Sequence, residues 1–194
     1  WALGEEVVQG DNSPLKAEVD DQAPWLTFGR YGSPNGGTRF SNRSQSLTVP
    51  SVPELNPGTG SFTTETWIRV PDPSVGSVLY PVDKVDGNSN GYQIAYVMSS
   101  GFSACQWFGN AGEMIVLGAN DNSLNDGQWH HLGCVLDRTP GQPMVGILYV
   151  DGLEAKRYEA PENHLSTLSS DTVFRIGWGN NAGELSQELD DVLY

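Results

Sequence analysis

The chain has 194 residues, and its 10 lysines and arginines stand against 24 aspartates and glutamates, for a formal net charge of −14. A surface of that sign repels a phosphate backbone, so composition argues against a nucleic-acid partner. The sequence holds no run of about eighteen apolar residues that could cross a bilayer as a helix, and no basic-then-apolar signal segment opens it. We therefore expect neither nucleic-acid binding nor membrane insertion.

The composition favours strands. Apolar residues make up 38% of the chain, enough for one sizeable core, and 23 glycines and 12 prolines indicate many turns. We expect an all-β fold and a single domain over residues 1–194. Because the chain begins at Trp1 instead of methionine, we also expect it to be a mature or excised part of a larger protein.

In chain order, residues 1–24 are acidic and weakly periodic, which predicts a leading arm packed on the edge of the fold. Short β-like runs at 24–29, 38–41 and 46–51 follow, separated by glycine- and asparagine-rich turns. The first long run, "SFTTETWIRV" (61–70), alternates as a half-buried strand does. Its predicted core face consists of Phe62, Thr64, Thr66, Ile68 and Val70.

Further β-like runs recur about every ten residues, a spacing that leaves no room for crossover helices and predicts a sandwich or barrel. They lie at 77–84, 91–98, 103–109, 113–119, 127–137, 144–152, 154–160, 172–179 and 187–194. Within "ILYVDGLEAKRYE" the Asp151-Gly152 pair predicts a tight two-residue hairpin turn, because both residues tolerate left-handed backbone conformations.

The two cysteines, Cys105 and Cys134, both lie inside apolar runs and lack CxxC spacing. A single disulfide and two buried thiols are both compatible with the sequence, because unpaired cysteine is itself a commonly buried residue.

The "WHH" trio at 129–131 looks at first like a metal or acid/base site. In a strand, however, His130 and His131 point to opposite faces and cannot jointly bind one ion. The third histidine, His164, falls in a predicted loop. We therefore expect structural roles, with one ring of the pair packed or hydrogen-bonded inside and the other at the surface.

Six short motifs occur along the chain in an order that is informative about the fold. They are "FTTETW" (62–67), "DKVDGNSNGYQI" (83–94), "DGQWHH" (126–131), "LYVDG" (148–152), "FRIGWG" (174–179) and "LDDVLY" (189–194). Over residues 25–194 this order resembles the laminin-G-like, concanavalin A-like lectin/glucanase superfamily. The resemblance implies a jelly-roll β-sandwich of two antiparallel sheets. It also implies an extracellular module, since many relatives bind carbohydrate or protein, several carry calcium, and a minority are glycoside hydrolases or polysaccharide lyases.

A glycosidase on this fold needs two carboxylates across the scissile bond. The E-x-D-x-x-E strand of the glucanase relatives is absent from this sequence, and so are the arginine, Gln-x-His and tyrosine signatures of the lyase relatives. Glu65 is isolated on its strand, and Glu184 and Glu188 stand four residues apart. We therefore expect a non-catalytic module.

Sugar binding uses aromatic faces together with a few polar anchors. The candidate ligand-binding residues are Trp178, Asn180, Asn181, Trp107, Gln106 and Tyr96, with Tyr92 as the alternative to Tyr96. Trp178 is the most suggestive of them, because it lies between two glycines. For Trp107 a core role is favoured over ligand binding, because its strand alternates with cysteine and phenylalanine. Trp67 and Trp129, at motif positions, are interpreted as core or sheet-packing residues.

By resemblance, Asp190 or Asp191 would hold a structural calcium ion on the outer face, with backbone carbonyls completing the site. The competing interpretation is that Asp190 faces solvent and Asp191 caps a turn. The favoured function is a carbohydrate-binding module located outside the cell, in the periplasm or on the cell surface, whose partners are glycans or other domains of a parent protein. The alternatives are a structural or protein-interaction module and, third, a glycan-active enzyme.

Overall fold

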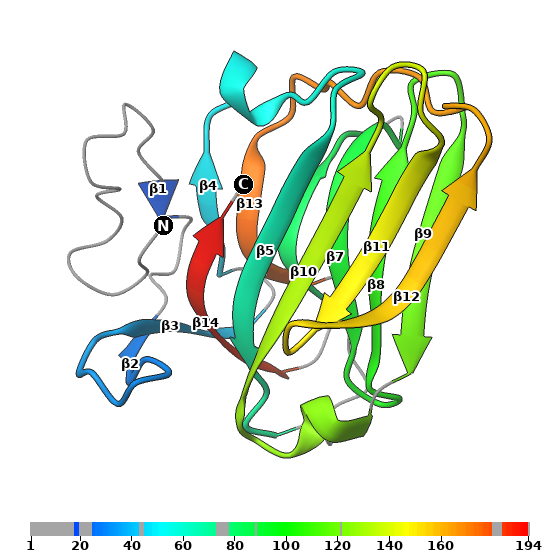
Figure 1. The fold of residues 1–194 in the computed structure, drawn as a ribbon. Helices are drawn as coiled ribbons and strands as arrows, with labels where there is room; N and C mark the ends of the chain where they lie inside the picture. The colour runs from blue at the N-terminus through cyan, green and yellow to red at the C-terminus, as the bar shows by residue number, and fades with distance from the viewer. Residues whose placement is uncertain are drawn as a thin grey trace.

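Two antiparallel sheets lie face to face in the computed structural model of the protein (Figure 1), which describes residues 18–19, 25–42, 45–72, 78–87, 89–120, 122–179 and 184–193. In the described ranges each sheet has seven strands, in the orders β1-β4-β13-β6-β7-β8-β9 and β12-β11-β10-β5-β14-β3-β2. This arrangement confirms the predicted all-β, jelly-roll-like sandwich.

The bounds of the strands are as follows. The first sheet contains β1 (Glu18–Val19), β4 (Leu47–Val49), β13 (Phe174–Gly179), β6 (Val78–Val85), β7 (Gly91–Val97), β8 (Phe102–Phe108) and β9 (Met114–Asn120). The second contains β12 (Leu153–Ala160), β11 (Met144–Val150), β10 (Trp129–Asp137), β5 (Phe62–Arg69), β14 (Glu184–Leu193), β3 (Gly37–Asn42) and β2 (Trp25–Thr27). Two 3-10 turns, η1 (Pro53–Leu55) and η2 (Asn122–Asn125), lie in connections. In the part of the chain that the structure describes, no helix is long and apolar enough to span a bilayer.

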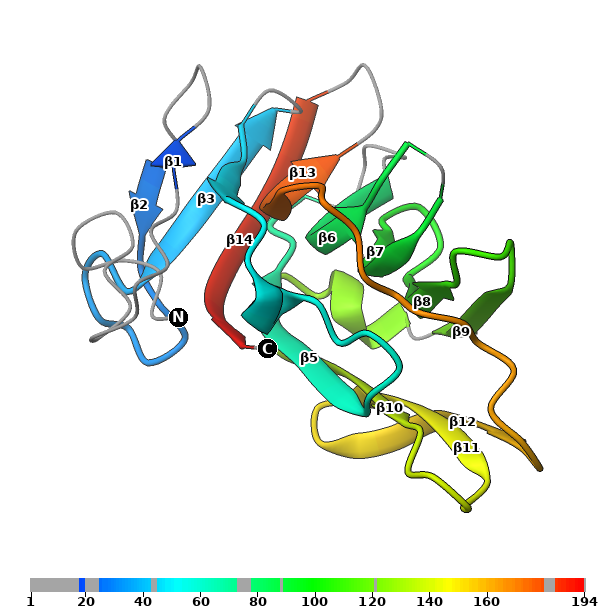
Figure 2. The ribbon, with the colours of Figure 1, turned by 90° about the horizontal axis from the view of Figure 1, so that it is seen from above.

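The core lies between the two sheets, which Figure 2 shows from above as separate layers. Strand β5 shows how alternation builds it: Thr64, Thr66 and Ile68 are all buried, and the residues between them are partly exposed. Val70 is also buried, and Phe62 packs against the core from its edge. The predicted inner face of this strand is therefore confirmed.

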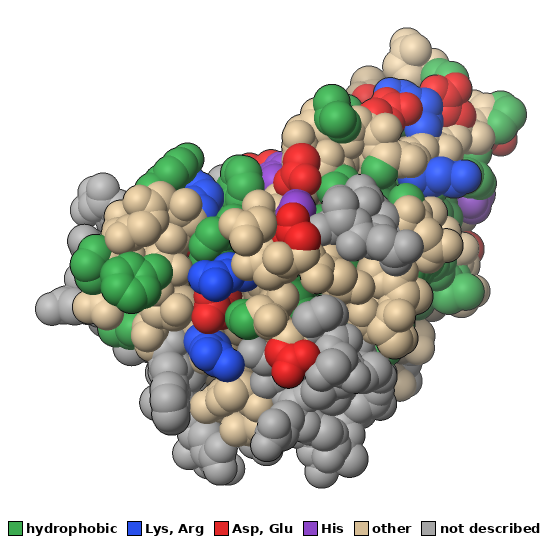
Figure 3. All heavy atoms as spheres, turned by 90° about the horizontal axis from the view of Figure 1, so that it is seen from below, with side chains coloured by type: hydrophobic (Ala, Val, Ile, Leu, Met, Phe, Trp, Pro, Cys, Tyr) green, Lys and Arg blue, Asp and Glu red, His purple; other side chains and the backbone are tan. Residues whose placement is uncertain are grey.

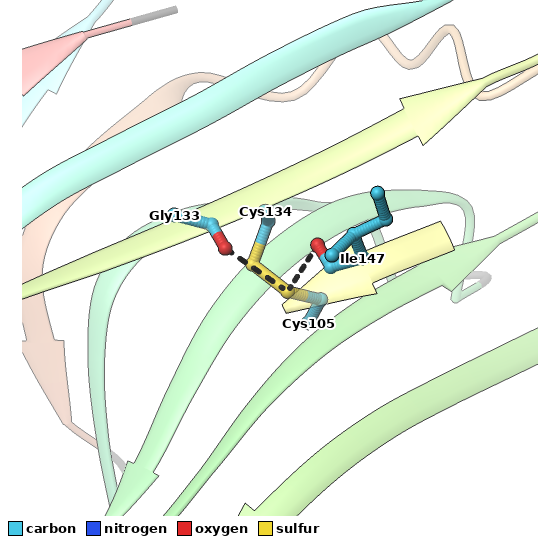
Figure 4. Close-up of a disulfide and its surroundings, with 4 residues drawn as sticks. All are labelled: Cys105, Gly133, Cys134 and Ile147. Atoms are coloured by element: carbon cyan, nitrogen blue, oxygen red, sulfur yellow. Dashed lines mark hydrogen bonds between the residues drawn. A yellow bond between two sulfur atoms is a disulfide. The ribbon is translucent and has the colours of Figure 1, made fainter. Parts of the chain in front are cut away.

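A disulfide crosses the core between the sheets (Figure 4). Cys105 of β8 and Cys134 of β10 are bonded, with a Cα–Cα distance of 5.6 Å. The Cys105 Sγ lies 4.0 Å from the Gly133 carbonyl oxygen and 3.9 Å from that of Ile147. Of the two alternatives that the sequence left open, the structure has the disulfide.

Two local predictions can be compared with the structure. Asp151 and Gly152 have φ values of 51° and 76°, so the predicted left-handed turn joins β11 to β12. Within the predicted leading arm, Glu18 and Val19 pair with Thr48 and Leu47 at the edge of the first sheet. The remainder of residues 1–24 lies outside the described residues.

Candidate ligand-binding face

A row of polar side chains crosses the outward face of the first sheet. Strand register places Arg175 opposite Asp83, Asp83 opposite Gln93, and Gln93 opposite Gln106, on strands β13, β6, β7 and β8. Each of these residues alternates with fully buried neighbours, so the sheet itself turns the four side chains away from the core. The row brings together the guanidinium, the carboxylate and two amides.

Hydrogen bonds tie the row together. Arg175 Nη1 donates to Asp83 Oδ2 at 3.1 Å, and the Val85 backbone N–H donates to Asp83 Oδ1 at 3.1 Å. The side-chain amide of Gln93 donates to the Gln106 oxygen. Burial raises the pKa of Asp83, and the hydrogen bonds from Val85 and Arg175 only partly oppose that rise. Asp83 is only 2% exposed, so its carboxylate serves to hold Arg175 in place, and the side chains of the row that reach the surface are those of Arg175, Gln93 and Gln106.

An aromatic pair lies on the same two strands as Arg175 and Asp83. Trp178 of β13 pairs in register with Tyr80 of β6, and their rings stack with centroids 5.1 Å apart and planes 23° from parallel. The Arg175 guanidinium carbon lies 5.7 Å from the Trp178 ring centroid. Both rings are partly exposed. Trp178, predicted from its glycine-flanked position, therefore lies beside the polar row, and Gln106, also predicted, is part of that row.

Two predicted ligand residues need correction. Trp107 and Tyr96 are 1% and 0% exposed, because alternation turns both toward the core. The Trp107 indole packs over Gly146 of the opposite sheet, and the Tyr96 hydroxyl bonds to Asn125. Neither ring offers a face to a ligand outside the sandwich, so both are core residues. The same holds for Tyr92, which is 1% exposed.

Two further tryptophans lie on the other sheet. Trp67 and Trp129 are partly exposed on the outward face of the second sheet, and Trp67 packs there against the His131 ring at a centroid distance of 5.3 Å. The prediction for Asn180 and Asn181 falls outside the described residues.

The aspartates of the final strand face an arginine. Asp190 Oδ2 lies 3.3 Å from Arg30 Nη1 and accepts the Arg30 backbone N–H at 3.1 Å, and Asp191 Oδ2 lies 2.5 Å from Arg30 Nη2. Among the described residues no group of three or more His, Cys, Asp or Glu side chains could hold a metal ion. Calcium takes six to eight oxygen ligands, so this pair, already bound to a guanidinium, does not fit the ion.

The tandem histidines lie on opposite faces, as alternation predicts. His130 is 8% exposed, with Nδ1 2.9 Å from Asp151 Oδ2 and Nε2 3.0 Å from Asp126 Oδ1. His131 points outward, with Nε2 3.3 Å from Glu65 Oε2. One ring is thus hydrogen-bonded inside and the other lies at the surface, and the buried ring ties the start of β10 to the β11–β12 turn.

The buried histidine makes stability depend on pH. Burial by itself lowers the pKa of His130, but hydrogen bonds and charge from Asp151 and Asp126 outweigh it and raise the pKa overall. A raised pKa adds stability that is complete below the unfolded value of about 6.5 and is lost as pH rises through the folded value. We expect the free energy of unfolding to fall across that window, as measured by urea titration at half-unit pH steps. His130→Gln removes this component, and His131→Gln serves as the control that retains it; an unchanged pH slope in His130→Gln would contradict the assignment.

The chain matches a known protein family. The family model described as the concanavalin A-like lectin/glucanases superfamily matches residues 40–193. The chain belongs to this superfamily. Among curated proteins, no sequence match was found.

Several solved structures of similar fold are described as binding domains. The binding domain of Paraclostridial Mosquitocidal Protein 1 superposes with a TM-score of 0.76 at 17% identity, over 98% of this chain and 47% of that one. The binding domain of botulinum neurotoxin DC in complex with rat synaptotagmin II gives 0.69 at 14% identity, over 92% and 42%. The same domain in complex with SialylT gives 0.66 at 14%, over 92% and 42%. This member of the concanavalin A-like superfamily therefore spans less than half the length of these chains, and at such identities the likeness establishes the fold.

Proposed function

We propose that the protein is a non-catalytic binding module whose ligand is a carbohydrate, held on the outward face of the first sheet. The observation that carries the proposal is the stacked Tyr80–Trp178 pair beside Arg175 and Asp83. Sugar rings pack against aromatic faces, and their hydroxyls bond to carboxylates, amides and guanidinium groups. The amide pair of Gln93 and Gln106 extends the same polar row across two further strands.

The chemistry of this face favours binding over hydrolysis. Glycoside hydrolysis takes two carboxyl groups, about 5 Å apart in retaining enzymes and further apart in inverting ones. The polar row contains a single carboxylate, Asp83, and that group already accepts hydrogen bonds from Arg175 and Val85. A second acid on the row would be needed for catalysis, so we assign the face to recognition.

We place the protein in an oxidising setting, secreted, periplasmic or on the cell surface. What supports this placement is the Cys105–Cys134 disulfide, because such bonds persist mainly outside the reducing cytosol. The structurally similar toxin domains are also described as binding or receptor-binding domains.

The proposal predicts that Trp178→Ala weakens glycan binding by about 10- to 100-fold, the loss typical of an aromatic anchor. Isothermal calorimetry against a panel of neutral and acidic polysaccharides measures it, because calorimetry does not depend on the fluorescence of the replaced residue. Trp129→Ala is the matched control, since Trp129 is also partly exposed but lies on the second sheet. Equal losses in the two variants, or wild-type affinity in Trp178→Ala, would refute the assignment of this face.

A second candidate function is protein binding through the β2–β3 hairpin. Leu26 of β2 is 44% exposed, and Phe28 and Tyr31 of the connection are 60% and 80% exposed, an unusual concentration of large apolar side chains on one hairpin. One structural neighbour is described in complex with a protein, rat synaptotagmin II. Failure of the wild type to bind any polysaccharide on the panel would favour this candidate.

A further inference from the structure

The Arg30 side chain lies at the centre of a cluster formed by the β2–β3 connection, β5 and the end of β14. Its guanidinium contacts the carboxylates of Asp190 and Asp191, and its carbon lies 4.5 Å from the Tyr31 ring centroid and 5.0 Å from that of Trp67. We call these five residues the Arg30 cluster. The cation is thus bounded by two negative charges and two aromatic faces, which are the groups that attract it.

The backbone of β14 is shaped to present both carboxylates to one cation. Consecutive side chains of a regular strand point to opposite faces. Here the pairing with β5 shifts between Asp190 and Val192, and Asp191 has a φ of 43°, in the left-handed region. This irregularity turns Asp191 to the same side as Asp190. Two neighbouring carboxylates on one side repel each other unless a positive charge lies between them.

The charge between them comes from the chain itself. Arg30 reaches Asp190 through both a side-chain contact and its backbone N–H, so the loop is held at two points. Burial lowers the pKa of Arg30, but the contacts with Tyr31, Asp191 and Asp190 outweigh it, and the guanidinium stays charged at every working pH. Asp190 is 7% exposed, so its charge is poorly solvated and depends on this partner.

We propose that the Arg30 guanidinium is a built-in cation occupying the place where a divalent metal ion would bind at the end of the final strand, so that this end of the sandwich is fastened without calcium. The guanidinium nitrogens lie 3.3 Å from Asp190 Oδ2 and 2.5 Å from Asp191 Oδ2, so a second cation at these oxygens would meet the positive charge of Arg30 at close range. The expected calcium ion at Asp190 and Asp191 is accordingly replaced by an internal ion pair. The β2–β3 connection, which carries the exposed Phe28 and Tyr31, is then held against β14 at any calcium concentration.

Thermal unfolding in EGTA and in millimolar calcium chloride tests the proposal. The wild-type midpoint is expected to be the same in both buffers. Arg30→Ala is expected to lower the midpoint in EGTA by on the order of 5 °C, and calcium is expected to restore part of that loss because the two carboxylates are then free to bind it. Adding Asp190→Asn and Asp191→Asn to Arg30→Ala removes the recovery.

A matched control separates this site from diffuse calcium binding by a chain of net charge −14. Arg157 also lies between two carboxylates, those of Glu154 and Glu159, but on the exposed edge strand β12. Arg157→Ala is expected to shift the midpoint little and to show no calcium response.

Two results would overturn the proposal. One is a wild-type midpoint that calcium raises, with the rise abolished by Asp190→Asn and Asp191→Asn. The other is an Arg30→Ala variant whose midpoint calcium does not raise. Should Arg30→Ala fail to fold in EGTA, Arg30→Gln is compared in the same two buffers, and refolding on addition of calcium counts as the expected recovery.

Discussion

Joint replacement of Cys105 and Cys134 by alanine is expected to lower the free energy of unfolding by about 3–4 kcal/mol, a large part of the stability of an ordinary domain. The two cysteines are 29 residues apart in sequence. Without the bond, the unfolded chain recovers the freedom of that loop, and the chain-entropy model relates the loss to loop length. In the folded protein the bond joins β8 of one sheet to β10 of the other, where both residues are buried.

Urea unfolding of the oxidised wild type and of the double alanine variant measures this loss. The control is wild type unfolded in a reducing agent, which keeps both sulfur atoms but not the bond. If the loss comes from the cross-link, the reduced wild type should approach the alanine variant, apart from the smaller packing loss of two sulfur atoms. A reduced wild type as stable as the oxidised protein would show that the bond adds nothing.

The fold could be predicted from the sequence because its signals are local. Alternation in residues 61–70 specifies which side chains of β5 enter the core, since successive side chains of a strand point in opposite directions. The Asp151-Gly152 turn was predicted for a similar reason, because left-handed φ values are easily adopted by those two residues. The order of six short motifs then predicted the superfamily, which the family match over residues 40–193 confirms.

The candidate site was predicted only in part, because it depends on register between distant strands. Arg175 and Asp83 are 92 residues apart in sequence but lie opposite each other in the first sheet. Alternation could have shown that each points away from the core, but a single sequence does not specify which strands are neighbours. Tyr80, Asp83, Gln93 and Arg175 were not predicted for this reason, whereas Trp178 was proposed from its flanking glycines.

The incorrect residue predictions also arise from features that residue type alone does not reveal, namely which face of a strand a side chain occupies and where the backbone departs from regular geometry. Trp107 and Gln106 are adjacent, and a shift of one residue in a strand exchanges the inward and outward faces. Trp107 was kept among the candidate ligand residues because of its residue type, although alternation already favoured a core role. In the structure it lies between Gln106 and Phe108 in β8 and packs over Gly146 in the core. At Asp191 the sequence likewise carried no sign of the left-handed backbone that turns its carboxylate toward Arg30.

Gly177→Ala is expected to destabilise the protein by about 3 kcal/mol, the second large effect. Gly177 has a φ of 82°, a conformation that costs an alanine on the order of 1 kcal/mol. A Cβ at this position would also lie 2.5 Å from ring carbons of Phe40, whose side chain is fully buried and cannot withdraw without opening the core. The free-energy cost of the backbone strain and that of the steric overlap with Phe40 therefore add.

Comparison with Gly141→Ala separates the two contributions. Gly141 has a φ of 77°, but nothing lies within 4 Å of a Cβ built there, so its variant carries the backbone strain alone. Urea unfolding should give a clearly larger loss for Gly177→Ala, and adding Phe40→Leu should recover part of the difference. Equal losses in the two alanine variants would contradict the contact with Phe40.

The same variant also affects the proposed binding face, because Gly177 directly precedes Trp178 in β13. The positive φ of Gly177 helps to set the direction of the next side chain, which stacks on Tyr80. Any movement of the backbone away from Phe40 therefore also moves the indole away from that stack. We expect Gly177→Ala to weaken glycan binding under conditions where the protein remains folded, whereas Gly141→Ala leaves it unchanged. Wild-type affinity in a folded Gly177→Ala variant would show that the direction of Trp178 does not matter for the ligand.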